Sequence, residues 1–511
     1  MRTGKAIKNV KYNIIFYVIL SMLTFITKKV FIDRLGDDMN GLNALFSSIL
    51  SLMNLAELGI GSAVMFALYK PVNENNKPLI NGILNLYKKM YSIAGVIMLT
   101  CGVIFIPFLG IFVKGDIALD LVRICYLIYL LNTSFSYFFS HKLTLLYVHQ
   151  QGYVISKYDG MAKVLKNIVQ ILILFLTPSY IYFLCVETIF NILYYYFINR
   201  TINNCFKDIL STKGVVEDKV KESIYSNIKA LSLHKMGSFV VFGTDYMLMA
   251  FFTNLDSVGN YSNYMFVITF FTTLVMKFFD GIIASIGNLI SSSNEDKTYN
   301  VFNKIFFFNF WLVCFVTISI YNTIDHFIYV FFGSGKLLNK YVIIFMMISF
   351  FITNMRPSIE KFKEAAGIYR QDRFAPILEA LINLVASLIL GHYFGIAGII
   401  LGTIISSVAI VFWLRPVLVY RIVFKRNSMD YFIKYFKGIA ITLIILLSSN
   451  FLGEALHFAM NGTGFLLKCI FNVLYINLFL VIIYRKSDEF IYFKELITTK
   501  LGSVFSKLKT S

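Results

Sequence analysis

The chain has 511 residues, of which 58% are hydrophobic and only 15% are charged, and its mean hydropathy is +0.71. So much apolar surface cannot be hidden in a water-borne core, so the composition excludes a soluble protein and predicts that lipid is the solvent. In a membrane protein the formal net charge of +19 is explained by basic loops on the inner side, and nucleic acid is not expected as a partner.

Fourteen apolar stretches follow one another along the chain, and crossing a bilayer takes about 20 helical residues. They predict an all-α membrane protein with 14 transmembrane helices. The expected spans are residues 10–32, 41–69, 90–112, 118–147, 153–177, 180–200, 233–253, 259–290, 301–322, 338–356, 374–392, 396–414, 431–450 and 464–484. With the N-terminus in the cytoplasm, the inside segments hold 38 of the 47 Lys and Arg residues and the outside junctions hold 8. This bias predicts that both termini are cytoplasmic.

The longest connection between spans predicts where the chain divides. In residues 203–230, apolar side chains recur at every fourth position, at Val216, Val220, Ile224 and Ile228, which favours a surface helix. We therefore expect five parts: an N-lobe of six spans (1–202), a cytoplasmic linker helix (203–230), a C-lobe of six spans (231–422), two further C-terminal spans (423–486) and an amphipathic cytoplasmic tail (487–511).

An internal repeat relates the two predicted lobes. One constant, ungapped shift along the chain lays the second span on the eighth and pairs identical residues, among them Asn40 with Asn260, Asn43 with Asn263 and Gly61 with Gly281. We call this displacement, which carries Asn40 onto Asn260, the repeat shift. Because both lobes start on the same side of the membrane, the repeats are parallel. Such six-helix lobes surround a central cavity.

Ionisable side chains inside the spans are the first candidates for function, because charges at membrane depth are costly and usually face a cavity or a partner. Lys28 and Lys29, at the outer part of the first span, either bind a phosphate group in the cavity or snorkel to the outer headgroups. Arg123 in the fourth span and the repeat-related Asn43 and Asn263 are the other residues expected in the substrate cavity.

Four further charged residues are candidates for gating or ion coupling. The repeat shift places Glu57 opposite Lys277, so that either the two pair in the inward-closed state or each finds a local partner. Asp245 and Asp280 either carry a coupling proton or sodium ion or make structural hydrogen bonds. Glu187 in the sixth span is a further charged residue inside the predicted spans. The sequence has no catalytic motif and no metal-ligand spacing such as H-E-x-x-H, and no cofactor is expected beyond a coupling ion.

Three groups of residues carry a family resemblance: LGDDMNGLNALFSSILSLMNLAELGIGSAVMFALYKP, then GTDYMLMAFF with VGNYSNYMF, and EAAGIYRQDRF with GIAGIILGTIIS. Through them nearly the whole chain resembles the Wzx-type polysaccharide repeat-unit flippases of the multidrug/oligosaccharidyl-lipid/polysaccharide exporter (MOP) superfamily. The resemblance implies that an oligosaccharide on undecaprenyl pyrophosphate is moved from the inner to the outer leaflet of the bacterial plasma membrane by alternating access. It further implies a role in capsule or other cell-surface polysaccharide synthesis, with a polysaccharide polymerase and glycosyltransferases as partners.

The same resemblance bears on the candidate cavity residues. In the related peptidoglycan-precursor flippase, arginines near the end of the first span face the cavity. Here Thr27, Lys28 and Lys29 stand in that region. A lysine would therefore take the arginine's role, without the paired hydrogen bonds that a guanidinium offers to a phosphate.

Two other classes of protein compete with a lipid-linked oligosaccharide flippase. A cation-coupled multidrug antiporter has the same architecture but usually stops at twelve spans, so spans thirteen and fourteen favour the flippase. A membrane glycosyltransferase or polymerase is the third choice, and it would need a sizeable outer loop, whereas all outside junctions in this sequence are short. The expected function is therefore that of a transporter and not of an enzyme.

Overall fold

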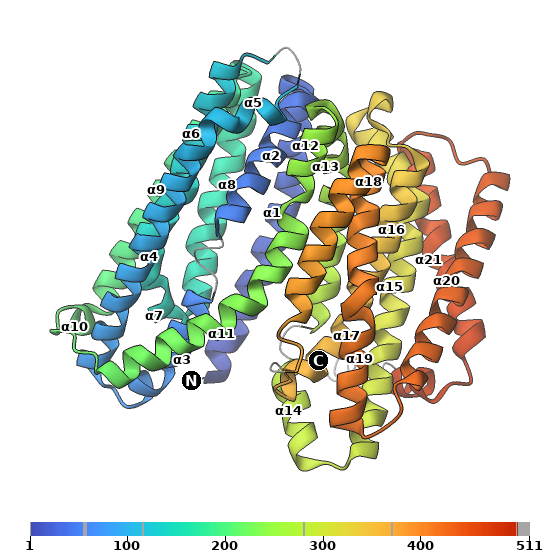
Figure 1. Ribbon diagram of the computed structural model, residues 1–511. Helices are drawn as coiled ribbons and strands as arrows, with labels where there is room; N and C mark the ends of the chain where they lie inside the picture. The colour runs from blue at the N-terminus through green and yellow to red at the C-terminus, as the bar shows by residue number, and fades with distance from the viewer. Residues whose placement is uncertain are drawn as a thin grey trace, which may run out of the picture. The chain divides into compact units, whose positions relative to one another are not determined.

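The structure is a computed structural model that describes residues 2–54, 59–114, 117–279, 282–368, 371–496 and 498. These ranges consist of helices joined by short connections, without a strand (Figure 1), and the predicted all-α class is confirmed. Within them, nine helical stretches are long and apolar enough to cross a membrane. The nine stretches coincide with ten of the 14 predicted spans, and the full count stays a prediction.

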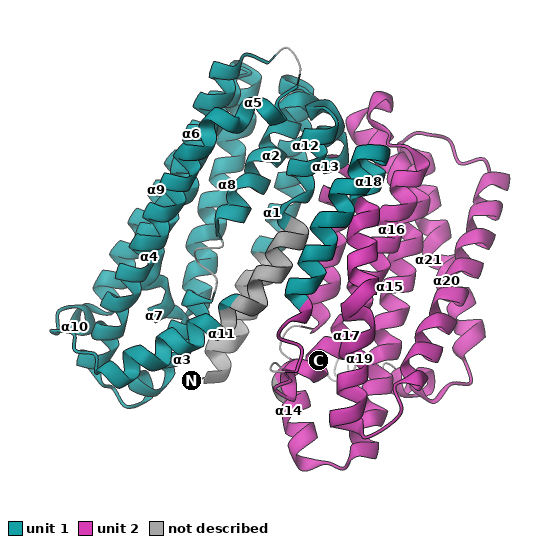
Figure 2. Ribbon diagram, in the orientation of Figure 1, with its two compact units in different colours: residues 1–262, 376–399 teal, residues 263–375, 400–511 magenta. Residues whose placement is uncertain are grey.

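Contacts divide the chain into two compact units, which Figure 2 shows in different colours. Unit 1 comprises Met1–Ser262 and Pro376–Ile399, and unit 2 comprises Asn263–Ala375 and Ile400–Ser511. The first unit contains α1 (Arg2–Leu35), α2 (Asp37–Met53), α3 (Ile60–Asn73), α4 (Lys77–Phe105), α5 (Leu109–Phe112), α6 (Leu119–Phe139), α7 (Leu143–Val148), α8 (Gly152–Leu176), α9 (Tyr180–Cys205), α10 (Lys207–Leu210), α11 (Asp218–Gly243) and α12 (Asp245–Phe252). The second contains α14 (Ile282–Ser292), α15 (Glu295–Phe332), α16 (Lys340–Met355), α17 (Pro357–Ala365), α19 (Phe412–Val419), α20 (Met429–Ala455) and α21 (Gly462–Tyr484). Two helices, α13 (Leu255–Phe279) and α18 (Ala375–Ser406), contribute residues to both.

The two units do not follow the lobes expected from the repeat. The repeat assigns residues 231–262 to the C-lobe, but in the structure α11 packs against α2 and α3, and α12 packs against α2. These contacts place that stretch in unit 1. Membership of a repeat reflects how a sequence arose by duplication, whereas a compact unit reflects which side chains pack together in one conformation.

The linker differs from its prediction. The sequence predicts a separate surface helix over residues 203–230, but α9 extends to Cys205, the short α10 follows, and α11 runs from Asp218 through the predicted seventh span to Gly243. No proline or glycine interrupts the sequence between Asp218 and the start of that span, so nothing ends the helix there. The predicted apolar face is used in part, because Ile224 is buried.

A reversal at Gly395 separates the eleventh and twelfth predicted spans. Gly395 has a φ of 56° and a ψ of −131°, which is not helical. Ser387 Oγ donates a hydrogen bond to the carbonyl oxygen of Ile399 at 3.2 Å. A straight helix would separate residues twelve apart by about 18 Å, so α18 consists of two antiparallel limbs. Gly398 lies against the backbone of Leu390 on the other limb, where a Cβ would collide, so the close approach of the two limbs requires glycine at this position.

Helix ends recur along the chain at the spacing of the repeat shift. The helical stretch that begins with α4 ends at Phe112, and α15 ends at Phe332, the position onto which the shift carries Phe112. The same shift carries α3 onto residues 280–293, where α14 lies, and carries α9 onto residues 400–425, where the chain is helical as far as Phe424. The predicted second span is itself divided between α2 and α3, and α3 begins after Gly59, whose φ of 83° is left-handed. The duplication is therefore visible in the order and length of the helices.

In unit 1, connections that the charge pattern assigns to the inside lie together at one end, and connections assigned to the outside lie together at the other end. At one end, Lys142 Nζ donates to Asn203 Oδ1 at 2.8 Å, and the connection after α10 hydrogen-bonds to the start of α4. At the other end, the Lys114 ammonium bonds the Phe251 carbonyl and the Arg34 guanidinium lies 4.7 Å from the centroid of the Phe175 ring. The alternation of predicted inside and outside junctions therefore matches the path of the chain within this unit.

An aromatic core stabilises unit 2. Phe302, Phe362 and Phe424 are each at most 1% exposed, and their ring centroids lie 5.0–5.5 Å apart. The start of the predicted tail is helical over residues 488–496, and the Phe490 ring stacks on Trp311 of α15 at 5.7 Å. Tail residues 497 and 499–511 lie outside the described residues.

Candidate functional site

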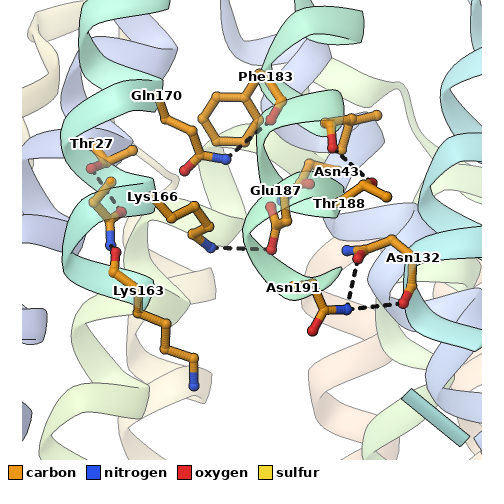
Figure 3. Close-up of polar contacts among 12 residues, drawn as sticks. Thr27, Asn43, Asn132, Lys163, Lys166, Gln170, Phe183, Glu187, Thr188 and Asn191 are labelled. Atoms are coloured by element: carbon orange, nitrogen blue, oxygen red, sulfur yellow. Dashed lines mark hydrogen bonds and ion pairs between the residues drawn. The ribbon is translucent and has the colours of Figure 1, made fainter. Parts of the chain in front are cut away.

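An ion pair joins two neighbouring helices of unit 1. Lys166 Nζ in α8 and Glu187 Oε1 in α9 are 3.1 Å apart, and their side chains are 20% and 32% exposed. Figure 3 shows the two side chains pointing toward each other. Charges at membrane depth generally face a water-filled cavity or the interior of a helix bundle and mark transport pathways. The pair is therefore the starting point of a candidate site.

Polar side chains on the same face of α8 extend the site toward α1 and α9 (Figure 3). Thr27 Oγ1 donates to Asn167 Oδ1 at 2.9 Å, and both side chains are buried. Gln170 Nε2 donates to the carbonyl oxygen of Phe183 at 3.2 Å. Such bonds hold membrane helices together, because an amide facing lipid would lose its partners. They fix α8 between α1 and α9, which positions Lys166.

Asparagine side chains continue the polar surface from α9 to α6 and α2. Asn191 Nδ2 donates to the side-chain oxygen of Asn132 at 2.8 Å and to its carbonyl oxygen at 3.2 Å. Tyr180 OH donates to Asn43 Oδ1 at 3.0 Å. We call the residues joined by these contacts, Thr27, Asn43, Asn132, Lys166, Asn167, Gln170, Tyr180, Glu187 and Asn191, the polar tract of unit 1. Ammonium, carboxylate, amide and hydroxyl groups in one bundle offer donors and acceptors to a sugar or a phosphate.

Most of the polar tract is missed by the sequence analysis. Asn43 is predicted as a site residue and Glu187 is recognised as an intramembrane charge, but the charge pattern counts Lys166 as an inside basic residue. The available signal is periodicity, because Lys163, Lys166, Asn167 and Gln170 follow one another at helical spacing on one face of α8.

Lys28 takes part in a second polar contact of unit 1. Its Nζ donates to the carbonyl oxygen and to the Oγ of Ser262, at 3.1 and 3.2 Å. Asn40 Nδ2 donates to the same Oγ at 2.9 Å and to the Gly259 carbonyl oxygen at 2.9 Å. At this crossing the helices touch backbone to backbone, because a Cβ on Gly41 would collide with the Leu255 carbonyl. The predicted cavity lysine thus joins α1 and α2 to the start of α13.

Two of the other predicted cavity residues form local ion pairs. Lys29 lies 3.0 Å from Asp33, one turn along α1, and Arg123 lies 3.1 Å from Asp120, and all four side chains are more than a third exposed. Asn263 is buried at the first position of unit 2. The structure therefore brings only Asn43 of the predicted cavity residues into the polar tract.

The predicted gating and coupling residues are only partly described. Glu57 and Asp280 lie outside the described residues, and their roles, including pairing of Glu57 with Lys277, stay predictions. Lys277 is exposed. Asp245 begins α12, and one of its carboxylate oxygens is buried without a hydrogen-bond partner among the described residues. Within the same ranges, no three His, Cys, Asp or Glu side chains come together as a metal site.

A buried ion cluster explains part of the EAAGIYRQDRF sequence. In unit 2, Lys363 pairs with Asp372, and both side chains are nearly inaccessible to solvent. Arg415 pairs with Glu360 and lies 3.7 Å from Asp372. These contacts fasten α17 and the residues after it to α19. Removal of one member would leave a buried charge without a partner, so the cluster has a structural role.

Comparisons with known proteins show the fold. No protein-family model and no curated protein matches the sequence. The structure is similar to the lipid II flippase MurJ in an inward closed conformation, with 16% identity and a TM-score of 0.65 over 92% of this chain and 99% of that chain. It is also similar to an inward-facing multidrug resistance MATE family transporter of the MOP superfamily, with 14% identity and a TM-score of 0.56 over 78% of this chain and 93% of the other. A Vibrio cholerae MATE transporter matches with 10% identity and a TM-score of 0.55 over 84% and 99% of the two chains. The chain therefore has the fold of these membrane transporters.

Proposed function

We propose that this protein is a Wzx-type flippase that moves oligosaccharide repeat units on undecaprenyl pyrophosphate from the inner to the outer leaflet of the bacterial plasma membrane. The observation that carries the proposal is the extent of the match to the lipid II flippase, which covers 92% of this chain. The uncovered remainder of the 511 residues is shorter than α20 and α21 together, which have 27 and 23 residues. The match therefore includes part of the C-terminal pair of helices, which twelve-span antiporters usually lack.

These two helices are integrated into unit 2 by polar bonds. Asn322 Nδ2 of α15 donates to Ser449 Oγ of α20 at 3.0 Å and to Asn472 Oδ1 of α21 at 2.7 Å. Trp311 Nε1 donates to Asn477 Oδ1 at 2.9 Å. Because buried polar groups in a membrane need such partners, these bonds fix how the two helices pack on α15.

The chemistry of the substrate agrees with the polar tract. A glycan with a pyrophosphate cannot enter hydrocarbon unaided, because each unpaired polar group would cost several kcal/mol. In the proposed cycle the prenyl tail stays in lipid and the headgroup exchanges its water for protein partners. The ammonium of Lys166 attracts the pyrophosphate away from the bulk, while Asn132 and Asn191 offer amide groups to sugar hydroxyls.

Glu187 keeps this binding reversible. In the absence of substrate its carboxylate neutralises Lys166 at 3.1 Å, so the ammonium is not left unpaired at membrane depth. A pyrophosphate competes with the carboxylate for the same ammonium. Release on the outer side follows when the carboxylate recovers its partner. Lys28 supplies a second ammonium in α1, and Lys29 and Arg123 act less directly because each is held by a local carboxylate.

Export by a bacterium without its own repeat-unit flippase tests the proposal. The protein is expressed there, and surface polysaccharide and lipid-linked oligosaccharide retained inside the cell are measured. Lys166→Ala is expected to lower export and to raise the retained intermediate. The matched control is Lys163→Ala, one turn away on α8, whose ammonium pairs locally with Asp159 at 2.8 Å. Failure of the unmodified protein to move lipid-linked oligosaccharide in reconstituted vesicles, or full export by the Lys166 variant, would overturn the proposal.

A cation-coupled multidrug antiporter is the second candidate, favoured by the MATE matches and by the carboxylate oxygen of Asp245 that has no hydrogen-bond partner among the described residues. In such a protein Asp245 would carry a proton or a sodium ion. Drug efflux driven by either ion, abolished in Asp245→Asn, together with no transport of lipid-linked glycan, would select this function.

A further inference from the structure

A basic pocket lies at the predicted inside end of unit 1, and none of its lining residues belongs to the polar tract. It has a volume of about 500 Å³ and is bounded by α4, the turn Ser140–Lys142, the end of α9 and α10. The ammonium-bearing side chains Lys88, Lys142 and Lys207 line it, together with His141 and Asn203. None of the lining residues, all of them within the described ranges, is acidic.

The nearest carboxylate in sequence does not neutralise the pocket. Asp208 follows Lys207 but lies 3.4 Å from Lys77, and both side chains are exposed. Lys142 Nζ is held by the neutral amide oxygen of Asn203 at 2.8 Å, which positions the ammonium and leaves its charge in place. The pocket therefore concentrates positive charge in a concave surface, where an anion is attracted more strongly than on a flat one.

His141 adds an imidazole ring to the three ammonium groups of the pocket. Its side chain is only 7% exposed. The ring lies in the pocket wall, so an oxygen of an anion in the pocket is a suitable partner for a ring N–H.

The repeat-related positions of the second half do not repeat the lysines of this pocket. The repeat shift places Lys88 on Phe308 and Lys142 on Phe362, and Gly82 of α4 falls on Phe302. In unit 2 the Phe302 and Phe362 rings pack in the aromatic core at 5.4 Å. Of the pocket's lysines, Lys142 is the one whose repeat-related residue, Phe362, is a buried ring of this aromatic core.

We propose that the pocket binds a phosphate-bearing anion. Compact ammonium groups and a histidine suit a phosphate, which accepts several hydrogen bonds from point charges. The pocket lies among helix ends that carry inside junctions, where the headgroup of an anionic phospholipid and free phosphate are the available sources. This site is separate from Lys28 and Lys166, so the result does not depend on which substrate is transported.

Binding to the purified full-length protein in a neutral detergent tests the site. Equilibrium binding is measured for inorganic phosphate, for phosphatidylglycerol and, as an uncharged-headgroup control, for phosphatidylcholine. The variant Lys88→Gln/Lys142→Gln/Lys207→Gln is expected to weaken anion binding by about tenfold or more, because hydrogen bonds to charged groups are lost. The charge-matched control is Lys70→Gln/Lys213→Gln/Lys219→Gln, which changes three lysines that do not line the pocket.

The binding results distinguish a lipid headgroup from free phosphate, and they show whether the pocket binds either anion. Phosphatidylglycerol binding that only the pocket variant loses, without competition by phosphate, identifies a lipid headgroup. Phosphate binding that phosphatidylglycerol displaces identifies a general phosphate site. The replacement of the same three lysines by arginine retains binding in either case, because the positive charges stay in the pocket. A thermal unfolding transition like that of the unmodified protein shows that the glutamine variant is folded. Equal losses in pocket and control variants, or no binding of either anion by the unmodified protein, overturn the proposal.

Discussion

Removal of one charge from the Lys166–Glu187 pair tests whether it binds substrate or only joins two helices. Lys166→Met keeps an apolar stem of similar length but leaves the Glu187 carboxylate without its ammonium. Breaking a buried pair costs about 3–5 kcal/mol, and breaking an exposed one about 0–1 kcal/mol. The two side chains are 20% and 32% exposed, so the pair is neither fully buried nor fully exposed. We therefore expect a loss of unfolding free energy between these two ranges, about 2 kcal/mol.

Thermal unfolding of the purified protein measures this loss. With an unfolding entropy of about 2 cal/mol/K per residue, 2 kcal/mol lowers Tm by about 2 °C in a chain of this length. The double variant Lys166→Met/Glu187→Gln removes both charges and is expected to recover most of the Tm, since the two effects are coupled through one contact. Its export of lipid-linked oligosaccharide stays low, because the ammonium that attracts the pyrophosphate is missing.

Tm and export together decide whether the Lys166–Glu187 pair binds substrate or only joins two helices. A double variant that recovers both Tm and export would refute the substrate role and leave a structural ion pair. A single variant with unchanged Tm would refute the contact itself. Lys163→Met is the control, because Lys163 is 52% exposed and a surface change of this kind stays within about 0.5 kcal/mol.

Three further predictions concern other contacts. Lys28→Ala is expected to lower export in the complementation assay, and Lys28→Arg is expected to restore part of it. Lys29→Ala is the control and exports nearly normally, because the Lys29 side chain is exposed and paired locally; equal effects at both positions would contradict this. Gly41→Ala forces a Cβ into the backbone of α13 and is expected to lower the stability by about 3 kcal/mol or more. Thermal unfolding measures this loss, and Gly335→Ala, which has open space around it, is expected to keep the stability of the unmodified protein. Asn322→Ala removes the bonds from α15 to α20 and α21 and costs about 1 kcal/mol; a Tm equal to that of the unmodified protein would show that these bonds do not hold the helices.

Local pattern in the sequence was sufficient for the class of fold and much of its topology. Hydropathy in windows of helical length depends only on neighbouring residues, so it placed the apolar helices, and it separated the two limbs of α18 at Gly395. Comparison of the chain with itself gave the repeat shift and revealed a duplication. The ends of the helices recur at the same spacing. Neither pattern anticipated that α11 begins at Asp218 and continues through the linker.

Only the tertiary structure decided which charges meet. Lys166 and Glu187 are 21 residues apart, Lys28 and Ser262 are 234 apart, and the walls of the basic pocket come from three separate segments. A sequence shows that a charge lies in an apolar span and therefore needs a partner, because burial makes an unpaired charge costly. It does not name the partner, because distance in space depends on how the helices cross. The amino-acid sequence thus determined which segments are helical, and the packing of the helices decided which of their polar groups work together.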